Sequence, residues 1–482
     1  MFDSCVIGSF SLTFNPKSCI MKNTFLLGSA FLYCYFIVSC TSASKEASVI
    51  QIFGEIAHYD QTEIILESVF GQHKTTVEDT HFSFEFSSED VHFYKLKVGH
   101  QEIPVFVLPG KPLHVSFDAE DVPSSVQFQG KTAKESQYLL NHAKVDDHAM
   151  GRRVTLDHRV DYYTVHKAHY DDKKRILDSL HSVSPKFNSR FYDMANANID
   201  FVSAEERIYF HINQSQNQDT ELVEEDFIFL DSIDFNRPEH LHIPNFKRLL
   251  SAYVSYKAPK QWMSSIDEVF EAIALNLTDK QAKELAYFME IDGAINYKGI
   301  EGVAEKLDFF KAYSTNPHYL NTLEKGFQKW AHLLPGEKAP PIEVQNTKGE
   351  KITLSDYYGK VVYVDLWATW CGPCKKELPH LANLKETYKN NPKIEILTIS
   401  MDNNRADWEL FLEENKLQGK QFWNKEAFSS EWSKKYLVNS IPRFILIDSD
   451  GSIVSATAPR PSQTDKLIPM IDELLDKRGT SI

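Results

Sequence analysis

Hydrophobic and polar residues alternate along the segment 48–130. The stretches HFSFEF (81–86) and LHVSFD (113–118) place a hydrophobic residue at every second position, and IPVFVLPGKP (103–112) is an apolar run closed by a Pro-Gly turn. A period of two, bounded by turn residues, is typical of strands. The pattern predicts a small antiparallel β domain over 48–130.

The segment 131–333 changes to a helical period. Thr278 and Gln281 have the spacing of a capping box, which predicts a helix start. Four apolar residues of another stretch follow the spacing i, i+3, i+4, i+7 on one helix face: Ile266, Val269, Phe270 and Ile273. We expect a mainly helical region that acts as a spacer or as a partner-binding surface.

Histidines are numerous in this helical region and raise the alternative of a metal site. They include His142, His148, His158, His166 and His169. Their spacings do not give two ligands at i, i+4 with a carboxylate partner, as a zinc-protease helix would. Solvated or locally hydrogen-bonded histidines are therefore expected, and no metal.

A Pro/Gly-rich break, LLPGEKAPP (333–341), precedes another change of pattern. Continuous apolar runs such as VVYVDLWA (361–368) and KIEILTIS (393–400) indicate buried strands, and the amphipathic RADWELFLEEN (405–415) indicates a helix between strands. RFILIDSDGSIVSA (443–456) predicts two strands joined by a tight turn, and residues 465–477 a closing helix. This alternation predicts an α/β domain over 335–482.

The turn DSDG (448–451) has an alternative interpretation, the start of a calcium loop. Such a loop needs an acidic residue at its twelfth position, which here is Pro459, so a hairpin turn is predicted instead.

Composition and charge narrow the class of protein. The chain has 482 residues, 42% hydrophobic, and a formal net charge of -15. One hydrophobic core rarely exceeds ~250 residues, so several domains are expected. The acidity, with no Lys/Arg stripe interleaved with aromatics, argues against a nucleic-acid partner.

The N-terminus has the features of a targeting segment, residues 1–39. Synthesis can equally begin at Met21, in which case residues 1–20 are a mis-assigned start, and Phe25 to Val38 form an apolar core of about fourteen residues. The stretch IVSC resembles the lipobox of bacterial lipoproteins, in which the cysteine, here Cys40, carries the lipid. Residues 40–47 would then be anchor and tether to a membrane. The alternatives are an ordinary secretory signal and an uncleaved anchor.

Cysteine usage points to a working dithiol. The six cysteines are Cys5, Cys19, Cys34, Cys40, Cys371 and Cys374. Cleavage and lipidation would leave two free thiols, Cys371 and Cys374, in an oxidising compartment where structural disulfides are usual. A C-x-x-C pair is also half of a zinc site, but there is no second C-x-x-C to complete one.

The surroundings of this pair resemble a thioredoxin fold of the TlpA/ResA-like branch, over residues 335–479. WCGPC (370–374) is the thioredoxin active-site sequence; Asp365 and Trp367 lie six and four residues before Cys371, and Pro379 lies eight after it. NSIPRF (439–444) matches the segment that supplies the family's cis-proline, here Pro442 after Ile441. The β domain, more loosely, resembles one found ahead of thioredoxin-like domains in lipoproteins of Bacteroidetes-type bacteria.

The resemblance implies roles for the central residues. Cys371, at a helix N-terminus, would be the attacking thiolate, because free N–H groups and the helix dipole favour the anion. Cys374 would resolve the mixed disulfide, and buried Asp365 would take its proton. The Cys371–Cys374 disulfide/dithiol is then the redox centre, with no other cofactor.

The resemblance also implies a substrate-binding surface. Its residues are Trp370, Gly372, Pro373, Ile441 and Pro442, around an exposed sulfur; Trp367 either joins them or belongs to the core. Arg443 stands where many thioredoxins have threonine. Pro442 lies 71 residues after Cys371, which implies an inserted helix and strand typical of this branch and of peroxiredoxins. A peroxidase would have a T-x-x-C motif, but Ala368 takes its first position.

The function implied is a thiol-disulfide oxidoreductase, chiefly a reductase of disulfides in cell-envelope proteins, supplied by a membrane thiol electron donor. It would be lipid-anchored and face the periplasm or the cell surface. One alternative is a disulfide isomerase or oxidase on the same site. The other is a binding or assembly lipoprotein in which the thioredoxin domain is secondary.

Overall fold

The structure is a computed structural model that describes residues 49–88, 92–122, 124–146, 159–183, 188–218, 222–260, 264–300, 302–417 and 419–476. The expected signal peptide, tether and lipidation residue Cys40 lie outside these residues. No helix within the described ranges has the length and apolar character needed to span a membrane.

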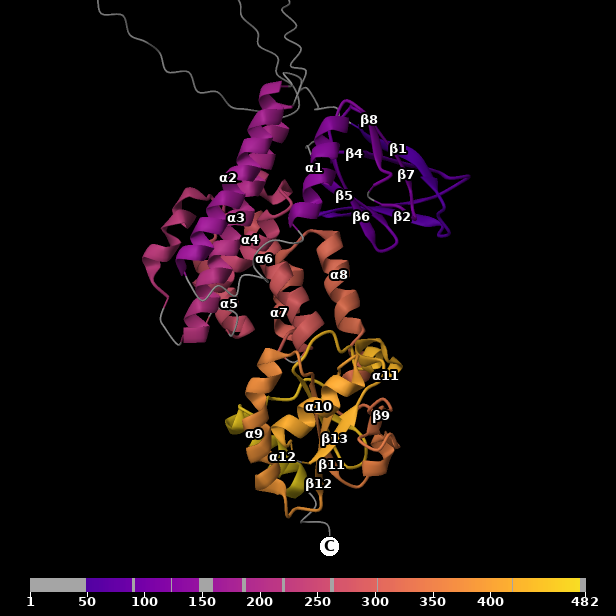
Figure 1. The fold of residues 1–482 in the computed structure, drawn as a ribbon, viewed down its shortest axis with the longest axis vertical. Helices are drawn as coiled ribbons and strands as arrows, with labels where there is room; N and C mark the ends of the chain where they lie inside the picture. The colour runs from indigo at the N-terminus through magenta and orange to yellow at the C-terminus, as the bar shows by residue number, and fades with distance from the viewer. Residues whose placement is uncertain are drawn as a thin grey trace, which may run out of the picture. The chain divides into compact units, whose positions relative to one another are not determined.

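The N-terminal region consists of two four-stranded sheets, with strand orders β4-β1-β7-β8 and β3-β2-β5-β6 (Figure 1). The strands are β1 (Val49–Ala57), β2 (Glu63–Ser68), β3 (Gly71–Thr76), β4 (His81–Ser87), β5 (His92–Val98), β6 (Gln101–Val107), β7 (Leu113–Asp118) and β8 (Gln127–Gly130). The period of two holds: in β4, Phe82 and Phe84 are buried, whereas His81, Ser83 and Glu85 are exposed. The sheets are antiparallel except for one pair, since β1 and β7 run parallel.

The middle region is helical, as predicted. Its α-helices are α1 (Ala133–Asp146), α2 (Arg159–Val183), α3 (Ser189–Gln218), α4 (Phe246–Lys257), α5 (Ile266–Asn276), α6 (Lys280–Gly293), α7 (Ala304–Tyr313) and α8 (Pro317–Gln328). Shorter turns are the 3-10 helices η1 (Glu224–Ser232), η2 (Pro238–His242) and η5 (Ala331–Leu333), and the π-helix η4 (Ala294–Lys298).

One predicted helix start in this region is wrong by a residue. The N-cap of α6 is Asp279, whose side chain accepts a hydrogen bond from the Ala282 N–H, and not Thr278. Both residues are good N-caps, so sequence alone could not choose between them.

Within the described ranges, the single group of three His, Cys, Asp or Glu side chains close enough to share an ion is His58, Asp118 and Glu120, in the β region. It contains none of the histidines of the helical region.

The C-terminal region has the predicted α/β fold. Its seven-stranded sheet has the order β10-β9-β13-β12-β11-β14-β15. The strands are β9 (Glu343–Asn346), β10 (Lys351–Thr353), β11 (Val361–Trp367), β12 (Ile394–Ser400), β13 (Lys420–Trp423), β14 (Arg443–Ile447) and β15 (Ile453–Ser455). The helices are η6 (Leu354–Tyr357), α9 (Gly372–Tyr388), α10 (Arg405–Asn415), η7 (Ala427–Ser429), α11 (Glu431–Lys435) and α12 (Thr464–Asp476).

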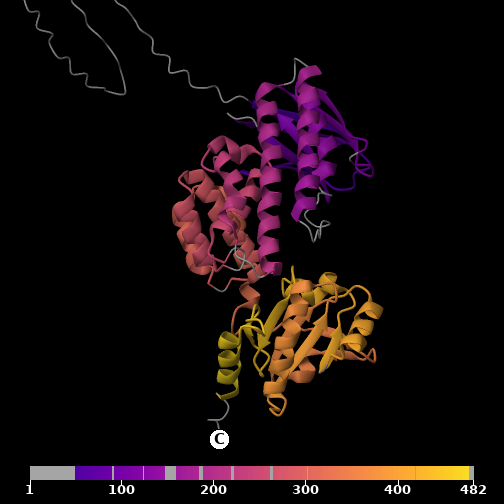
Figure 2. The ribbon, with the colours of Figure 1, turned by 60° about the vertical axis from the view of Figure 1, so that its left-hand side comes forward.

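Strand β11 is central and buried along its whole length, between β12, which runs parallel, and β14, which runs antiparallel. α9 and α12 pack on one face of the sheet, where Leu381 and Leu467 join a cluster with Val361 and Tyr363 of β11. Figure 2 shows this sheet from the side, with α12 in yellow near the C-terminus. Odd-numbered residues of β11 therefore point toward α9 and α12.

The segment after β14 is a hairpin turn, as expected in place of a calcium loop. The Gly451 N–H donates to the Asp448 carbonyl over 2.9 Å, and Gly451 has a φ of 84°, in the left-handed region that favours glycine.

We predict that Leu467→Ala destabilises the protein by roughly 2–5 kcal/mol, because Leu467 is fully buried between α12 and the sheet. Its neighbour Lys466 is exposed, so Lys466→Ala should change stability by less than about 0.5 kcal/mol. Urea unfolding of both variants measures the difference. Equal effects would contradict the packing of α12.

Candidate active site

The two cysteines of the C-terminal region lie at the start of α9, just beyond the carboxyl end of β11. Cys371 is the N-cap of the helix, and its Sγ accepts a hydrogen bond from the Cys374 N–H over 3.1 Å. The two sulfurs form a disulfide, with the Cα atoms 5.3 Å apart. One helical turn brings positions i and i+3 to the same face, which explains why this spacing allows the bond.

Both cysteines are buried in this oxidised state, Cys371 being 4% exposed and Cys374 2%. They belong to an apolar cluster with Trp367, Trp408 and Trp423. The expectation of an exposed sulfur is therefore wrong for Cys371. Trp367, which is fully buried, belongs to the core and not to the surface around the site.

The exposed part of the site is the loop and first turn around the disulfide. Trp370 is 61% exposed, and Gly372 and Pro373 are exposed as well. These are three of the five predicted substrate-binding residues. Aromatic surface beside a reactive sulfur can hold the apolar part of a partner.

The remaining two residues, Ile441 and Pro442, precede β14. The Ile441–Pro442 peptide bond is cis, and Ile441 packs against the cluster that contains the cysteines. Ile441 and Cys371, far apart in the sequence, thus belong to the same apolar cluster. The next residue, Arg443, is buried, and its Nε donates to the Ala456 carbonyl over 2.7 Å.

The loop that leads into Cys371 is held by a residue that sequence reasoning missed, Asp402 at the end of β12. Its buried carboxylate accepts hydrogen bonds from the Thr369 N–H and from the hydroxyls of Thr369 and Ser400, both at 2.7 Å. Several hydrogen bonds to one carboxylate fix the loop that carries Trp370 and Cys371.

Asp365 lies where the sequence placed it, on the central strand β11, and is 3% exposed. Its odd position directs it toward α9, the helix that carries the cysteines. Burial raises the pKa of the Asp365 carboxyl to about 7, the nearby Lys385 lowers it in part, and Glu377 raises it further. A carboxyl with this pKa can accept and release a proton near neutral pH.

Glu377 is a second buried acid that the sequence analysis missed. It lies three residues after Cys374 on α9, and its carboxylate accepts from the Ser462 N–H and hydroxyl at 3.0 and 2.9 Å. Arg460 adds an ion pair at 3.7 Å. The i, i+3 spacing from Cys374 was the available signal, since it places both side chains on one helix face.

The geometry gives a cysteine pair at the N-terminus of α9, two buried acids on α9 and β11, and a cis peptide whose Ile441 packs against the cluster that contains the cysteines. A dithiol that closes to a disulfide in place can exchange two electrons with another disulfide. A helix N-terminus stabilises the thiolate that such exchange needs.

Comparisons with known proteins agree with this class. A family model described as thioredoxin-like matches residues 359–453. The thiol-disulfide oxidoreductase ResA of Bacillus cereus (strain ATCC 10987 / NRS 248) is 34% identical over 134 residues, 28% of this chain and 75% of the relative. ResA of Bacillus subtilis (strain 168) is 32% identical over 119 residues, 25% of this chain and 64% of the relative.

Part of the chain is also similar to solved structures. The thioredoxin domain of a thiol-disulfide oxidoreductase from Bacteroides vulgatus is 30% identical and covers 29% of this chain and 97% of its own, with a TM-score of 0.27. A thiol-disulfide oxidoreductase from Bacteroides fragilis NCTC 9343 is 29% identical and covers 28% of this chain and 99% of its own, with a TM-score of 0.26.

The fold and site define a thioredoxin-like protein-disulfide oxidoreductase. The chain belongs to the family of thiol-disulfide oxidoreductases that includes ResA.

We predict that Asp365→Asn stabilises the oxidised protein at alkaline pH. The folded-state pKa of about 7 lies above the ordinary 3.8, so the folded protein binds this proton more tightly than the unfolded chain does. The free energy of unfolding therefore falls as the pH rises from the ordinary pKa of 3.8 to the folded-state pKa of about 7. Removing the ionisable group should add up to about 4 kcal/mol above pH ~8 and almost nothing near pH ~4.

Urea unfolding at the two pH values tests this prediction. The control is Asp308→Asn, which changes an exposed carboxylate on α7 and should have little effect at either pH. A gain from Asp365→Asn of the same size at both pH values would contradict the raised pKa.

Proposed function

We propose that this protein reduces disulfides in proteins of the cell envelope through Cys371 and Cys374. The observation that carries the proposal is the Cys371–Cys374 disulfide at the N-terminus of α9. In the reduced form, the Cys371 thiolate attacks a sulfur of the substrate disulfide. A mixed disulfide forms, and the first substrate sulfur leaves with the electron pair.

Cys371 is the proposed nucleophile because it is the N-cap of α9. The Cys374 N–H already points at its Sγ, and the positive end of the helix dipole lies at the same place. Both effects favour the thiolate over the thiol and lower the pKa that a free cysteine would have.

Cys374 is the proposed resolving thiol, and Asp365 its proton acceptor. Cys374 is buried one turn further along α9, so its proton cannot pass directly to solvent. With a pKa of about 7, the Asp365 carboxyl is partly ionised at neutral pH and can take that proton. The Cys374 thiolate then attacks Cys371, the Cys371–substrate bond breaks, and the second substrate sulfur is released.

Substrate binding is proposed for the exposed surface around the disulfide. Trp370, Gly372 and Pro373 offer apolar and backbone contacts on one side. The segment of Ile441 and Pro442, whose Ile441 packs against the cysteine cluster, is proposed to pair through its backbone with an extended substrate segment, as a sheet edge does.

The proposed setting is the cell envelope. The apolar N-terminal segment and its IVSC sequence support export and a lipid anchor on Cys40. Because each turnover consumes two electrons, a membrane thiol donor must reduce the disulfide again. No cofactor besides the dithiol is proposed.

Two other functions are alternatives, and only the first of them uses the dithiol. As a disulfide isomerase or oxidase, the protein would have a more oxidising potential; as a binding or assembly lipoprotein, it would need the upstream regions and not the dithiol. The Gly-Pro spacer between the cysteines favours the reductase.

We predict that Cys374→Ser traps substrates as mixed disulfides on Cys371, because the resolving thiol is absent. Non-reducing electrophoresis of envelope extracts, followed by mass spectrometry, identifies the trapped proteins. Cys371→Ser/Cys374→Ser is the matched control and should trap nothing. Absence of any mixed disulfide would favour the binding lipoprotein.

We predict a reduction potential near that of thioredoxin, about -270 mV, from equilibration with a glutathione or dithiothreitol buffer. A value near about -120 mV would instead identify an oxidant and exclude the reductase.

A further inference from the structure

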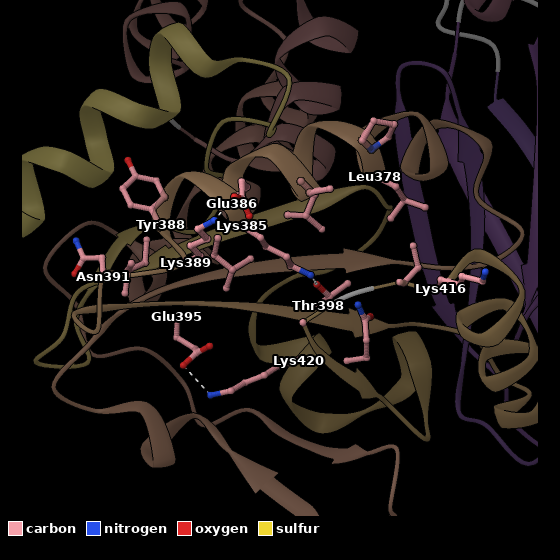
Figure 3. A pocket seen from close by; sticks show the side chains of 18 of the residues that line it. Leu378, Lys385, Glu386, Tyr388, Lys389, Asn391, Glu395, Thr398, Lys416 and Lys420 are labelled. Carbon is pink, nitrogen blue, oxygen red and sulfur yellow. Dashed lines mark hydrogen bonds and ion pairs between the residues drawn. The ribbon is translucent and has the colours of Figure 1, made fainter.

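A cavity of about 1220 Å³ lies beside the active-site helix, between α9, strands β12 and β13, and the end of α10. Figure 3 shows its lining, in which Lys385 extends from α9 toward Thr398 of β12. The same cavity is lined by exposed charged residues such as Glu386 on α9 and Lys389 just after it. None of the residues assigned above to sulfur chemistry lines it.

Lys385 is held at the wall of this cavity that faces the sheet. Its Nζ donates a hydrogen bond to the Thr398 Oγ1 over 2.9 Å, and Thr398 is fully buried. Lys385 is half-buried and lies against Gly419: a Cβ at that glycine would be 3.1 Å from the Nζ. The ammonium therefore occupies a defined place and is not a freely moving surface charge.

Asp365 lies next to Thr398, on the neighbouring strand of the sheet. Thr398 and Asp365 are direct partners in the parallel pair of β11 and β12, so their side chains lie on the same face of the sheet. Asp365 is buried and does not line the cavity, whereas Lys385 and Thr398 do. Lys385 and Thr398 thus separate the cavity from the buried carboxyl.

Asp365 and Lys385 also interact through their charges. Burial raises the pKa of Asp365 and lowers that of Lys385, and each charge opposes this effect on the other. Of the charged residues that line the cavity, Lys385 is the one that acts in this way on Asp365.

The other ionisable groups around Asp365 do not line the cavity. They are Glu377 on α9, Tyr363 on the same strand, and Arg460, which pairs with Glu377. The Tyr363 hydroxyl donates to the Pro459 carbonyl over 2.7 Å. A route from Asp365 toward the cavity therefore passes Lys385 and Thr398.

Resting on the function proposed above, we propose that Lys385 is a positioning residue that favours the carboxylate form of Asp365 and connects it, through Thr398, to the cavity. In resolution, Asp365 takes the proton of the Cys374 thiol, the Cys371–Cys374 bond forms, and the Cys371–substrate bond breaks. Asp365 then returns this proton to solvent past Thr398 and Lys385, which restores the carboxylate for the next turnover. Electrons move only between sulfurs.

The test follows the resolution step of the full-length protein, reduced and mixed with a chromogenic aromatic disulfide in a stopped-flow instrument. The first thiol released reports attack by Cys371, and the second reports attack by Cys374. For Lys385→Met, we expect the pH midpoint of the second release to rise by about one unit. The carboxylate fraction at pH ~7 then falls about fivefold, and the rates converge near pH ~9.

Matched variants separate this role from a structural one. Lys389→Met makes the same change at the C-cap of α9, at a residue that lines the same cavity and pairs with Glu386, and should leave the midpoint unchanged. Lys385→Arg keeps the charge, so its midpoint should stay close to that of the unmodified protein. If Lys385→Met does not fold, Thr398→Val, which removes the hydroxyl that holds Lys385, should shift the midpoint in the same direction.

An unchanged midpoint in Lys385→Met, or equal slowing at every pH, overturns the role of Lys385 and leaves the dithiol function intact. If the unmodified protein releases no second thiol, or Cys371→Ser releases thiol at the same rate, the proposed function itself fails.

Discussion

The packing of the first turn of α9 against the carboxyl end of β11 is the contact on which the site depends. It makes Cys371 an N-cap, so that free backbone N–H groups face its sulfur. The same packing buries Cys374 and places Asp365 beneath the helix. The N–H groups at the helix N-terminus favour a thiolate at Cys371. Exclusion of water favours the neutral form of the Asp365 carboxyl.

Two side chains of α9 act in opposite directions on the buried carboxyl of Asp365: Lys385 lowers its pKa and Glu377 raises it. Burial favours the neutral forms of Asp365 and Lys385, and the charge of each favours the charged form of the other. Glu377 is further held by Ser462 and Arg460, whereas Asp365 has Lys385. The two acids therefore have different surroundings: Glu377 has hydrogen-bond donors and an ion pair of its own, whereas burial raises the pKa of Asp365 to about 7.

The tryptophans of the site also differ in their surroundings, since some are buried in the core and one is exposed. Trp367 and Trp408 are fully buried and form the apolar wall behind the cysteines, while Trp370 is largely exposed. Asp402 holds the loop between them through Thr369. The core therefore fixes the position of the sulfur, and the exposed ring is left available for a partner.

The sequence by itself determined the order of the three regions, the central strand with Asp365, and the dithiol, because period, turn residues and the WCGPC motif are local signals. It did not determine the parallel pairing of β1 with β7, the burial of Cys371, or the roles of Asp402, Glu377 and Lys385. These depend on which segments far apart in the chain meet. Only the tertiary structure decides which side chains lose water and which charges then face one another, and this sets the pKa values of the site.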